Sequence, residues 1–428
     1  MIRRYFVWLH RWVGLSIATF LVIEGLTGSI LAFRQPLSRL FSPQLFASAP
    51  GPHGKLLDLA TLAERAETLI PQGGVGYFAR VADDQVVLRM HGRKDPSTGE
   101  AYDIGFKYLV LDPWTGNELG RLKDGFYSQG FWANIIPFVL DLHISLNSRF
   151  GDLILSIVAL VWSVDCFVGF YLTLPSGKGG FWRRWNYAWL VKWRASAFRI
   201  NFDLHRAGGL WFWFALFIFA WSSTNLTGLG GSVYDWVTGK VFPYQAAEQQ
   251  EASMPQRTSD APPLLDWRAA QLRGAELMSE EASKQGFLVE TVIGFTHLTP
   301  NGLYVYTAQT NRRFPLNRDV SVYFDGDTGA LYGAAGLNDL PDDRIGNKVT
   351  TWLRALHMIS DPVDYMPYRI YVFLTGLVIA LLSVTGVYIW WKKRTIRLLA
   401  TRKVRAAAAS VPVASSSLLL TFGSMPTT

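Results

Sequence analysis

Four of the seven histidines stand close to where long apolar segments begin, namely His10, His143, His205 and His357. Titratable side chains at a membrane boundary are costly, which makes them functional candidates. The segments at His10 and His205 open alike, as "LHRWVGL" and "LHRAGGL". Histidine nitrogen is a common ligand of haem iron, and facing helices can supply one axial histidine on each side of a porphyrin. These residues therefore suggest haem binding, provided that the fold brings them together in pairs.

The apolar segments themselves are long enough to cross a bilayer of about 30 Å. They cover residues 7–33, 153–174, 210–229 and 368–391. Hydrophobic residues make up 50% of the chain and charged residues only 17%, which is typical of a membrane protein with sizeable soluble parts. The first run is too long for the apolar region of a signal peptide, and no small-residue cleavage site follows it. We therefore expect an uncleaved anchor.

Lysine and arginine indicate the orientation of these spans. They are concentrated before the first span, between the second and third, and after the fourth, whereas the loops 35–142 and 231–356 mix both signs with a slight acidic excess. The positive-inside rule then places both termini in the cytoplasm and both long loops outside. The net charge of +8 is thus a topology signal, so that we expect a lipid bilayer and no nucleic acid as partner.

The two long loops have the patterns of small α+β domains. Each has one helical pattern, at 56–69 and at 267–286, followed by strand patterns at 75–81, 85–91 and 107–111 and at 288–296, 303–308 and 320–324. Each then contains D-x-x-T-G-x-x-x-G, in "DPWTGNELG" from Asp112 and in "DGDTGALYG" from Asp325. This pattern suits a tight hairpin. Because the same turn recurs at the same place, the sequence predicts an internal duplication.

The predicted fold class is a mainly α membrane protein with four transmembrane helices in two repeats, each with an external α+β domain between its two helices. The expected organisation is helix 1 with a short cytoplasmic N-terminus at 1–34, external domain 1 at 35–142, helix 2 at 143–174, a basic cytoplasmic loop at 175–204, helix 3 at 205–230, external domain 2 at 231–356, helix 4 at 357–392 and a basic, then disordered, cytoplasmic tail at 393–428. We also expect a flexible insertion at 243–263 and disorder at 406–428.

This topology sorts the four histidines by depth. The first and third spans begin at the cytoplasmic face, which groups His10 with His205. The second and fourth spans begin at the external face, which groups His143 with His357. Each face thus has two histidines on different helices, as a six-coordinate haem requires.

The residues beside the inner histidines suit a haem slot. Gly14 and Gly209 follow their histidines by four residues, so they share the same helix face and leave space for a macrocycle. Arg11 and Arg206 stand next to the same histidines and are candidates to pair with haem propionates.

The sequence supports a haem slot at the outer pair less well, because Asn147 and Asp361 stand at the positions four residues after the histidines, where the inner pair has glycines. Its propionate candidates are Arg149, Arg354 and Arg369. A zinc site remains an alternative at either face, although two histidines fall short of the usual three or four protein ligands.

The remaining polar residues leave several roles open. Cys166 is the only cysteine, so neither an intrachain disulfide nor covalent C-x-x-C-H haem attachment is possible, and any haem is non-covalent. Glu24 and Asp165 lie within spans, where proton balance during electron transfer and helix-to-helix hydrogen bonding are both open. We expect Asn225 to serve in packing. Surface or turn positions are expected for the histidines without ligand spacing, His53, His91 and His297.

Taken together, the motifs resemble those of the PepSY-associated transmembrane proteins over about residues 5–395. The resemblance rests on "LHRWVGL", "FDLHRAGGLW", the "LH" before the second and fourth spans, and the D-x-x-T-G turns. Within the family, the chain is similar to inner-membrane ferric-siderophore reductases of the FoxB type. The resemblance implies a bacterial inner membrane, periplasmic PepSY-like domains, and two b-type haems whose axial ligands are His10, His143, His205 and His357.

The expected function is therefore that of a dihaem reductase, which passes electrons across the membrane to ferric siderophores and releases Fe(II) for uptake. The sequence has no nucleotide fingerprint, so the expected donor is a quinol or a separate reductase. One alternative is a haem-bearing conduit to another periplasmic acceptor. Another is a non-enzymatic protein that binds siderophore or peptide. A transporter is disfavoured because we expect no paired broken helices.

Overall fold

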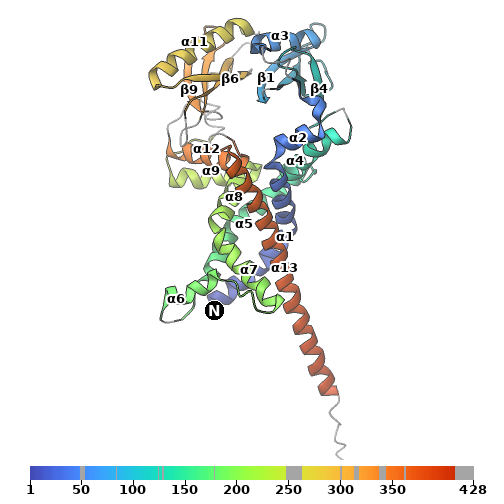
Figure 1. The fold of residues 1–428 in the computed structure, drawn as a ribbon, viewed down its shortest axis with the longest axis vertical. Coiled ribbons are helices and arrows are strands. Elements are labelled where there is room, and N and C mark those ends of the chain that lie inside the picture. Colours follow the sequence, from blue (N-terminus) through green and yellow to red (C-terminus); the bar gives the residue numbers. More distant parts are fainter. Residues whose placement is uncertain are drawn as a thin grey trace, which may run out of the picture.

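A helical bundle forms one end of the molecule and a large β-sheet the other, as the ribbon in Figure 1 shows. The N-terminus lies in the bundle, at the end away from the sheet. The computed structural model describes residues 1–48, 54–82, 84–123, 125–127, 130–177, 179–246, 263–298, 301–312, 318–336, 344–360 and 363–409.

Three helices of the bundle are long and apolar enough to cross a membrane. They are α1 (Ile2–Leu31), α5 (Gly151–Thr173) and α13 (Met366–Ala409). A fourth crossing is complete only if α7 (Ala197–Trp211) and α8 (Trp213–Leu226) count as one span. The structure thus has three or four candidate spans at the predicted places.

The third span is bent, which the sequence did not indicate: α7 and α8 meet at an angle of 68°. The break falls at Phe212, among large aromatic residues and without a proline. Tertiary hydrogen bonds hold both sides of the bend. The indole N–H of Trp211 donates to the carbonyl of Trp189, and that of Trp213 donates to the carbonyl of Cys166. Neither partner is near in sequence, which is why the apolar pattern looked continuous.

A close helix crossing in the bundle joins α1 and α13 through small residues. A Cβ atom added to Gly25 or to Gly376 would overlap the carbonyl oxygen of the other glycine. Ser29 lies at the same crossing and donates to the carbonyl of Phe373 at 2.9 Å. Small residues let two backbones approach closely where lipid offers no hydrophobic drive for association.

Shorter helices surround the ends of the spans. Two of them, α4 (Ile135–Ser145) and α12 (Ile345–Met358), precede α5 and α13 and end at residues with positive φ, Leu146 and Ile359. The others are α2 (Arg34–Phe41), η1 (Pro43–Leu45), η2 (Trp132–Asn134), α6 (Phe181–Asn186), η3 (Tyr187–Trp189) and α9 (Gly228–Val241).

The strands of both long loops form one antiparallel sheet of nine strands in the order β5-β4-β3-β2-β1-β6-β7-β8-β9. Their bounds are β1 (Gly73–Ala82), β2 (Gln85–Gly92), β3 (Tyr108–Leu111), β4 (Glu118–Lys123), β5 (Phe126–Tyr127), β6 (Val289–Leu298), β7 (Leu303–Thr310), β8 (Asp319–Asp325) and β9 (Leu331–Gly336). The pairing of β1 with β6 joins the two loops, with Phe78 opposite Phe295. The sequence suggested two separate domains because it gives no sign of this pairing.

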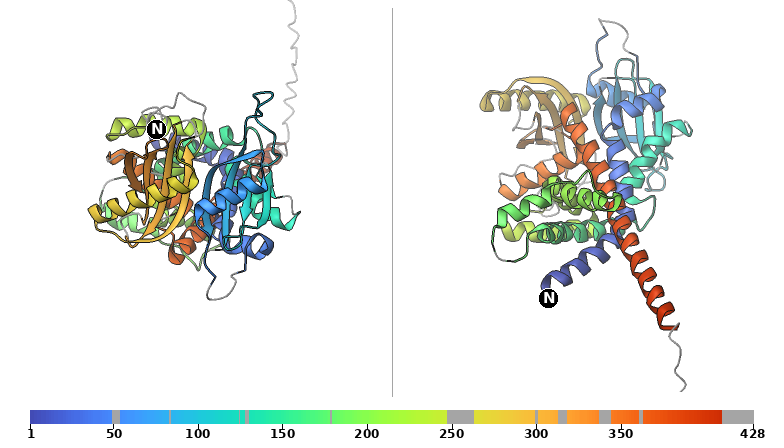
Figure 2. Two further views of the ribbon diagram at one scale, coloured as in Figure 1. Left: turned by 90° about the horizontal axis from the view of Figure 1, so that it is seen from above. Right: turned by 60° about the horizontal axis from the view of Figure 1, so that its bottom comes forward.

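Two helices cover the face of the sheet that points away from the bundle. In the view from above in Figure 2, α3 (Leu59–Leu69) and α11 (Trp267–Gln285) lie side by side across it. Asp58 and Asp266 cap these helices by accepting from backbone N–H groups three residues on. Beneath them is one shared apolar core, in which Leu62, Leu88 and Phe295 are fully buried.

The two D-x-x-T-G turns connect β3 to β4 and β8 to β9 as the pattern predicts. The Asp112 carboxylate accepts from the N–H groups of Trp114 and Thr115, and Asp325 accepts equivalently at its own turn. Gly116 and Gly329 have φ values of 70° and 69°, which favour glycine. The sequence missed β4, β5 and β9, whose residues do not alternate clearly.

The α1–α13 crossing gives a test of the fold. We expect Gly376→Val to destabilise the protein by about 1–3 kcal/mol, because the new side chain overlaps the backbone of α1. Thermal unfolding of the detergent-purified protein measures this. Leu377→Ala is the matched control, since Leu377 is 38% exposed on the outside of the bundle. Equal midpoints for the two variants would contradict the close crossing.

Candidate functional site

The structure brings the four predicted histidines together as the two expected pairs. His10 of α1 and His205 of α7 have ring centres 6.2 Å apart, with planes inclined by 53°. His143 of α4 and His357 of α12 have ring centres 6.3 Å apart, with planes inclined by 44°. We call them the far-side pair and the sheet-side pair, from their positions relative to the sheet.

The positions of the sheet-side histidines differ from the sequence-based expectation in one respect. The sequence placed His143 and His357 at the starts of spans. They lie instead in the last turns of α4 and α12, which are separate helices ahead of α5 and α13. Left-handed residues end both helices, Leu146 after α4 and Ile359 after α12, and the apolar pattern does not reveal these breaks.

Each far-side imidazole is held through its Nδ1 atom by another helix. His10 Nδ1 lies 2.9 Å from both carboxylate oxygens of Asp165, on α5. His205 Nδ1 lies 3.0 Å from the carbonyl oxygen of Leu382 and 3.1 Å from the hydroxyl of Thr385, on α13. The Thr385 hydroxyl donates its own hydrogen to Leu382, so it accepts from the imidazole.

The sheet-side pair follows the same rule. His143 Nδ1 lies 2.9 Å from the Thr27 hydroxyl and 3.0 Å from the Glu24 carboxylate, both on α1. His357 Nδ1 lies 2.8 Å from the hydroxyl of Ser222, on α8. Both hydroxyls donate to a carbonyl of their own helix, Thr27 to residue 23 and Ser222 to residue 219, so both accept from the imidazole.

These contacts assign one tautomer to all four rings. Every Nδ1 faces acceptors, so Nδ1 carries the hydrogen and Nε2 keeps its lone pair. Among the described residues, none forms a hydrogen bond with any of the four Nε2 atoms. Metal-binding histidines characteristically donate the other ring N–H to a carboxylate, carbonyl or hydroxyl in this way, which fixes the ring and strengthens the ligand.

The spacing within each pair fits a shared metal atom. A metal–imidazole bond is about 2 Å long and the ring centre lies about 1 Å behind the nitrogen, so two opposed ligands have centres about 6 Å apart. The observed separations are 6.2 and 6.3 Å. In the parts of the chain that the structure describes, no three His, Cys, Asp or Glu side chains converge on one point. Haem iron needs only two protein ligands, because the porphyrin supplies four.

A cavity of about 600 Å³ surrounds the far-side pair, within the range of small-molecule and cofactor sites. Its walls come from α1, α5, α7, α8 and α13 and are mainly apolar. Gly14 and Gly209 line it, and a Cβ added to either would meet no atom within 4 Å. Both glycines therefore border open space, as the haem-slot hypothesis requires.

Three further glycines lie against the imidazoles. A Cβ added to Gly169 would lie 3.5 Å from the Cε1 atom of His10, and one added to Gly386 would lie 3.1 Å from that of His205. Gly28 stands in the same relation to His143, at 3.2 Å. The sequence analysis did not assign these residues to the site. Their signal was present in the matching "VGFYLTL" and "TGVYIWW" segments, which contain Gly169 and Gly386.

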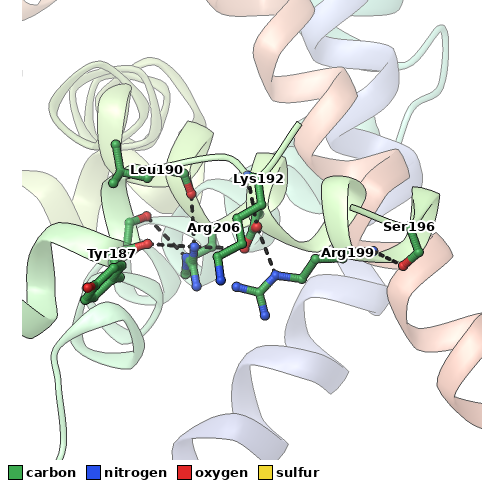
Figure 3. A network of polar contacts seen from close by, with 8 residues as sticks. Tyr187, Leu190, Lys192, Ser196, Arg199 and Arg206 are labelled. Carbon is green, nitrogen blue, oxygen red and sulfur yellow. Dashed lines mark hydrogen bonds and ion pairs between the residues drawn. The ribbon is translucent and has the colours of Figure 1, made fainter. Parts of the chain in front are cut away.

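The two arginines next to the far-side histidines have different surroundings. The guanidinium of Arg206 donates to buried Asp203 at 2.8 Å and to the carbonyls of Tyr187 and Leu190, as Figure 3 shows. It therefore fastens the 187–192 segment to α7. Arg11 lines the cavity and forms no hydrogen bond or ion pair with any described residue. Other basic residues of the cavity wall are Arg3, Lys393 and Arg397.

Each arginine proposed for the propionates of the sheet-side pair contacts another side chain of the protein. Arg354 donates to the side chain of Asn225 at 2.7 Å, which gives Asn225 a hydrogen-bonding role besides packing. Arg369 donates to Asp364, also at 2.7 Å. Arg149 lies over the ring of Phe150. Asp361 lies outside the described residues.

Of the other residues singled out in the sequence, Cys166 borders the far-side cavity, and the unpaired histidines lie on the sheet or outside the described residues. Cys166 is buried in the apolar centre of the bundle, which fits the packing role. His91 lies on β2 and His297 on β6, where its ring packs on Tyr304. Neither His53 nor residues 247–262 of the expected insertion belong to the described residues.

Apolar helices long enough to cross a membrane, with an attached antiparallel sheet, define a membrane protein. The comparison with protein families agrees at the level of class. The chain belongs to the family described as the PepSY-associated TM region, whose model matches residues 7–393. Among proteins with curated descriptions, none matches the sequence.

Asp203 gives a test of the far-side architecture. We expect Asp203→Ala to increase hydrogen exchange of the 187–196 segment, because Arg199 and Arg206 lose a fully buried partner. The lost hydrogen bonds cost about 1–3 kcal/mol, because the two arginines that remain are partly exposed. Glu118→Ala, which breaks a partly exposed pair with Arg121, is the control and should cost less than about 1 kcal/mol. Unchanged exchange at 187–196 would contradict the role of Asp203.

Proposed function

We propose that the protein is a dihaem reductase that passes electrons across a bacterial inner membrane to ferric siderophores. One observation carries the proposal: two pairs of histidines, each with ring centres just over 6 Å apart and every Nδ1 hydrogen bonded to an acceptor. His10 and His205 would hold one b-type haem, and His143 and His357 the other. Bound haem supplies a reversible one-electron couple.

The residues around the far-side pair support such a cofactor. Gly14 and Gly209 leave the space that a flat macrocycle needs, and the surrounding apolar side chains exclude water. Arg11, with Lys393 and Arg397, supplies positive charge for the carboxylates of the group. The guanidinium of Arg206 already donates to Asp203 and to carbonyls of residues 187–190, so we do not assign it a haem carboxylate.

The separation of the two pairs supports a transmembrane function. Helix α1 carries His10 and, 18 residues later, Gly28, which touches His143. At a rise of 1.5 Å per residue these positions are about 27 Å apart along the helix, close to the thickness of the hydrocarbon layer. Trp162 packs in the bundle between them: it lines the far-side cavity and contacts the apolar cluster of Phe219, which touches His357.

The proposal includes a duplicated architecture with a defined orientation. In support, strand order runs alike outward from the β1–β6 pair, the D-x-x-T-G hairpins have the same hydrogen bonds, and Gly169 and Gly386 contact equivalent histidines. The lysine and arginine distribution supports a cytoplasmic far side and a periplasmic sheet. A quinol or a separate reductase would then be the donor, since the sequence has no nucleotide motif.

The acceptor is proposed from the similarity to FoxB-type reductases and from coordination chemistry. Siderophores hold Fe(III) through hard oxygen donors, which bind Fe(II) less tightly. Reduction at the sheet side therefore releases iron. The two remaining alternatives, a conduit to another periplasmic acceptor and a siderophore- or peptide-binding protein without enzymatic activity, are distinguished by the experiments that follow.

Haem content is the first test. We expect about two low-spin b-type haems per chain in the detergent-purified protein, and one in either His205→Ala or His357→Ala, because each change removes one axial ligand. Absorption spectra of the oxidised and dithionite-reduced protein measure this, together with a haem assay. His297→Ala is the control, since His297 lies on the sheet and belongs to neither pair. Protein made with ample haem supply but containing none would overturn the proposal and favour the non-enzymatic alternative.

The acceptor is tested by rapid mixing. We expect ferric siderophores to reoxidise the dithionite-free reduced protein, with formation of Fe(II) that a ferrous chelator detects. The single-haem variant His357→Ala should lose this reaction at least tenfold while it retains the far-side spectrum, because the sheet-side group is missing. A fully active His357→Ala variant would refute the sheet-side assignment. Reduced wild-type protein that ferric siderophores do not reoxidise would favour the alternative of a conduit to another periplasmic acceptor.

A further inference from the structure

Within each histidine pair, the two Nδ1–H groups face acceptors of different charge. In each pair, one Nδ1–H points to a carboxylate and the other to neutral acceptors. Asp165 and Glu24 are the carboxylates, and they contact His10 and His143. The sequence analysis left their roles open between proton balance and helix-to-helix hydrogen bonding. In the structure, each carboxylate contacts the Nδ1 atom of a candidate iron ligand.

The far-side carboxylate engages its histidine alone. Both oxygens of Asp165 lie 2.9 Å from His10 Nδ1, and Asp165 is only 9% exposed. His10 Nδ1 has no other hydrogen-bond partner among the described residues. The full charge of this carboxylate therefore acts on one N–H group.

The sheet-side carboxylate shares its histidine with a hydroxyl. His143 Nδ1 lies 3.0 Å from Glu24 Oε2 and 2.9 Å from the Thr27 hydroxyl. Thr27 donates its own hydrogen to the carbonyl of residue 23, so it competes with Glu24 as an acceptor. The second oxygen of Glu24 is buried and has no hydrogen-bond partner among the residues that the structure describes. Glu24 therefore withdraws less of the proton from its imidazole than Asp165 does.

Such partners tune a metal through its ligand. An imidazole whose N–H is drawn toward a carboxylate is a stronger electron donor, which stabilises the oxidised metal and lowers its reduction potential. Asp165 does not share the N–H group of His10, so it should lower the reduction potential of the far-side metal more strongly. Glu24 shares the N–H group of His143 with Thr27, so it should lower the potential of the sheet-side metal less.

We propose that Asp165, Glu24 and Thr27 act as positioning residues that give the far-side haem the lower potential and the sheet-side haem the higher one. Electrons then run downhill from the far side to the sheet. This inference rests on the proposed function, since it requires haem at both pairs.

Positive charge near the far-side cavity acts in the opposite sense and is the smaller effect. Arg11, Lys393 and Arg397 line the wall and would favour the reduced state. A haem carries two carboxylates of its own, which would offset the charge of these cations. Moreover, charges near the end of a bundle are screened by water, whereas Asp165 touches the ligand itself.

Single-haem proteins measure each potential separately. His143→Ala leaves only the far-side haem, and His205→Ala leaves only the sheet-side haem. We expect the far-side potential to be the lower in spectroelectrochemical titration. Asp165→Asn in the His143→Ala protein should raise it by about 59 mV or more, a tenfold change in the one-electron equilibrium, because a neutral amide replaces the charge.

Thr27→Val in the His205→Ala protein provides a test of opposite sign. The valine is nearly isosteric and cannot accept, so Glu24 takes the whole hydrogen bond and the sheet-side potential should fall. Glu24→Gln should raise it. Ser163→Ala is the control for both backgrounds: within the described part of the chain Ser163 bonds only to Ala159 and Thr224, and no shift is expected.

The possible outcomes distinguish a failure of this inference from a failure of the proposed dihaem function. Protein without haem refutes the proposed function. Two haems with the higher potential on the far side, an Asp165→Asn variant that leaves its potential unchanged, or a Thr27→Val variant that raises the sheet-side potential each refutes the inference while the dihaem assignment stands.

Discussion

The hydrogen bond from histidine Nδ1 to an acceptor on a neighbouring helix is the interaction on which the candidate site depends. It occurs four times and joins different elements each time: α1 to α5, α7 to α13, α4 to α1, and α12 to α8. Each bond fixes a ring, leaves Nε2 available and ties two helices together. The helices and the candidate ligands are therefore positioned by the same contacts.

Close backbone packing makes these bonds possible. The glycine crossing of α1 and α13 brings two helices into contact that each support both ends of the bundle. Helix α1 contributes His10 at one end and Glu24 and Thr27 at the other, so its placement affects both pairs. Gly386 and Gly28 also leave room for the imidazoles, because a Cβ there would lie only 3.1 Å from His205 Cε1 and 3.2 Å from His143 Cε1.

The sheet is joined to the site through the chain connections. Helices α4 and α12, which carry the sheet-side histidines, follow the last strands of the two loops. Since the strands form one sheet with one apolar core, α4 and α12 are both connected to the same packed unit. This gives a physical reason for the paired approach of His143 and His357, which lie 214 positions apart (357 − 143).

Local patterns in the sequence determined the apolar spans, most strands, both D-x-x-T-G hairpins and the grouping of the four histidines by depth. Apolar length, period-two alternation and turn chemistry are properties of neighbouring residues, so they can be read without the fold. Only the tertiary structure decided the 68° bend at Phe212, the β1–β6 junction and the acceptors behind each histidine. Thr385 lies 180 residues from His205, and Ser222 lies 135 from His357. A hydroxyl among many in apolar helices has no distinguishing local pattern, because its partner is selected by packing between distant segments.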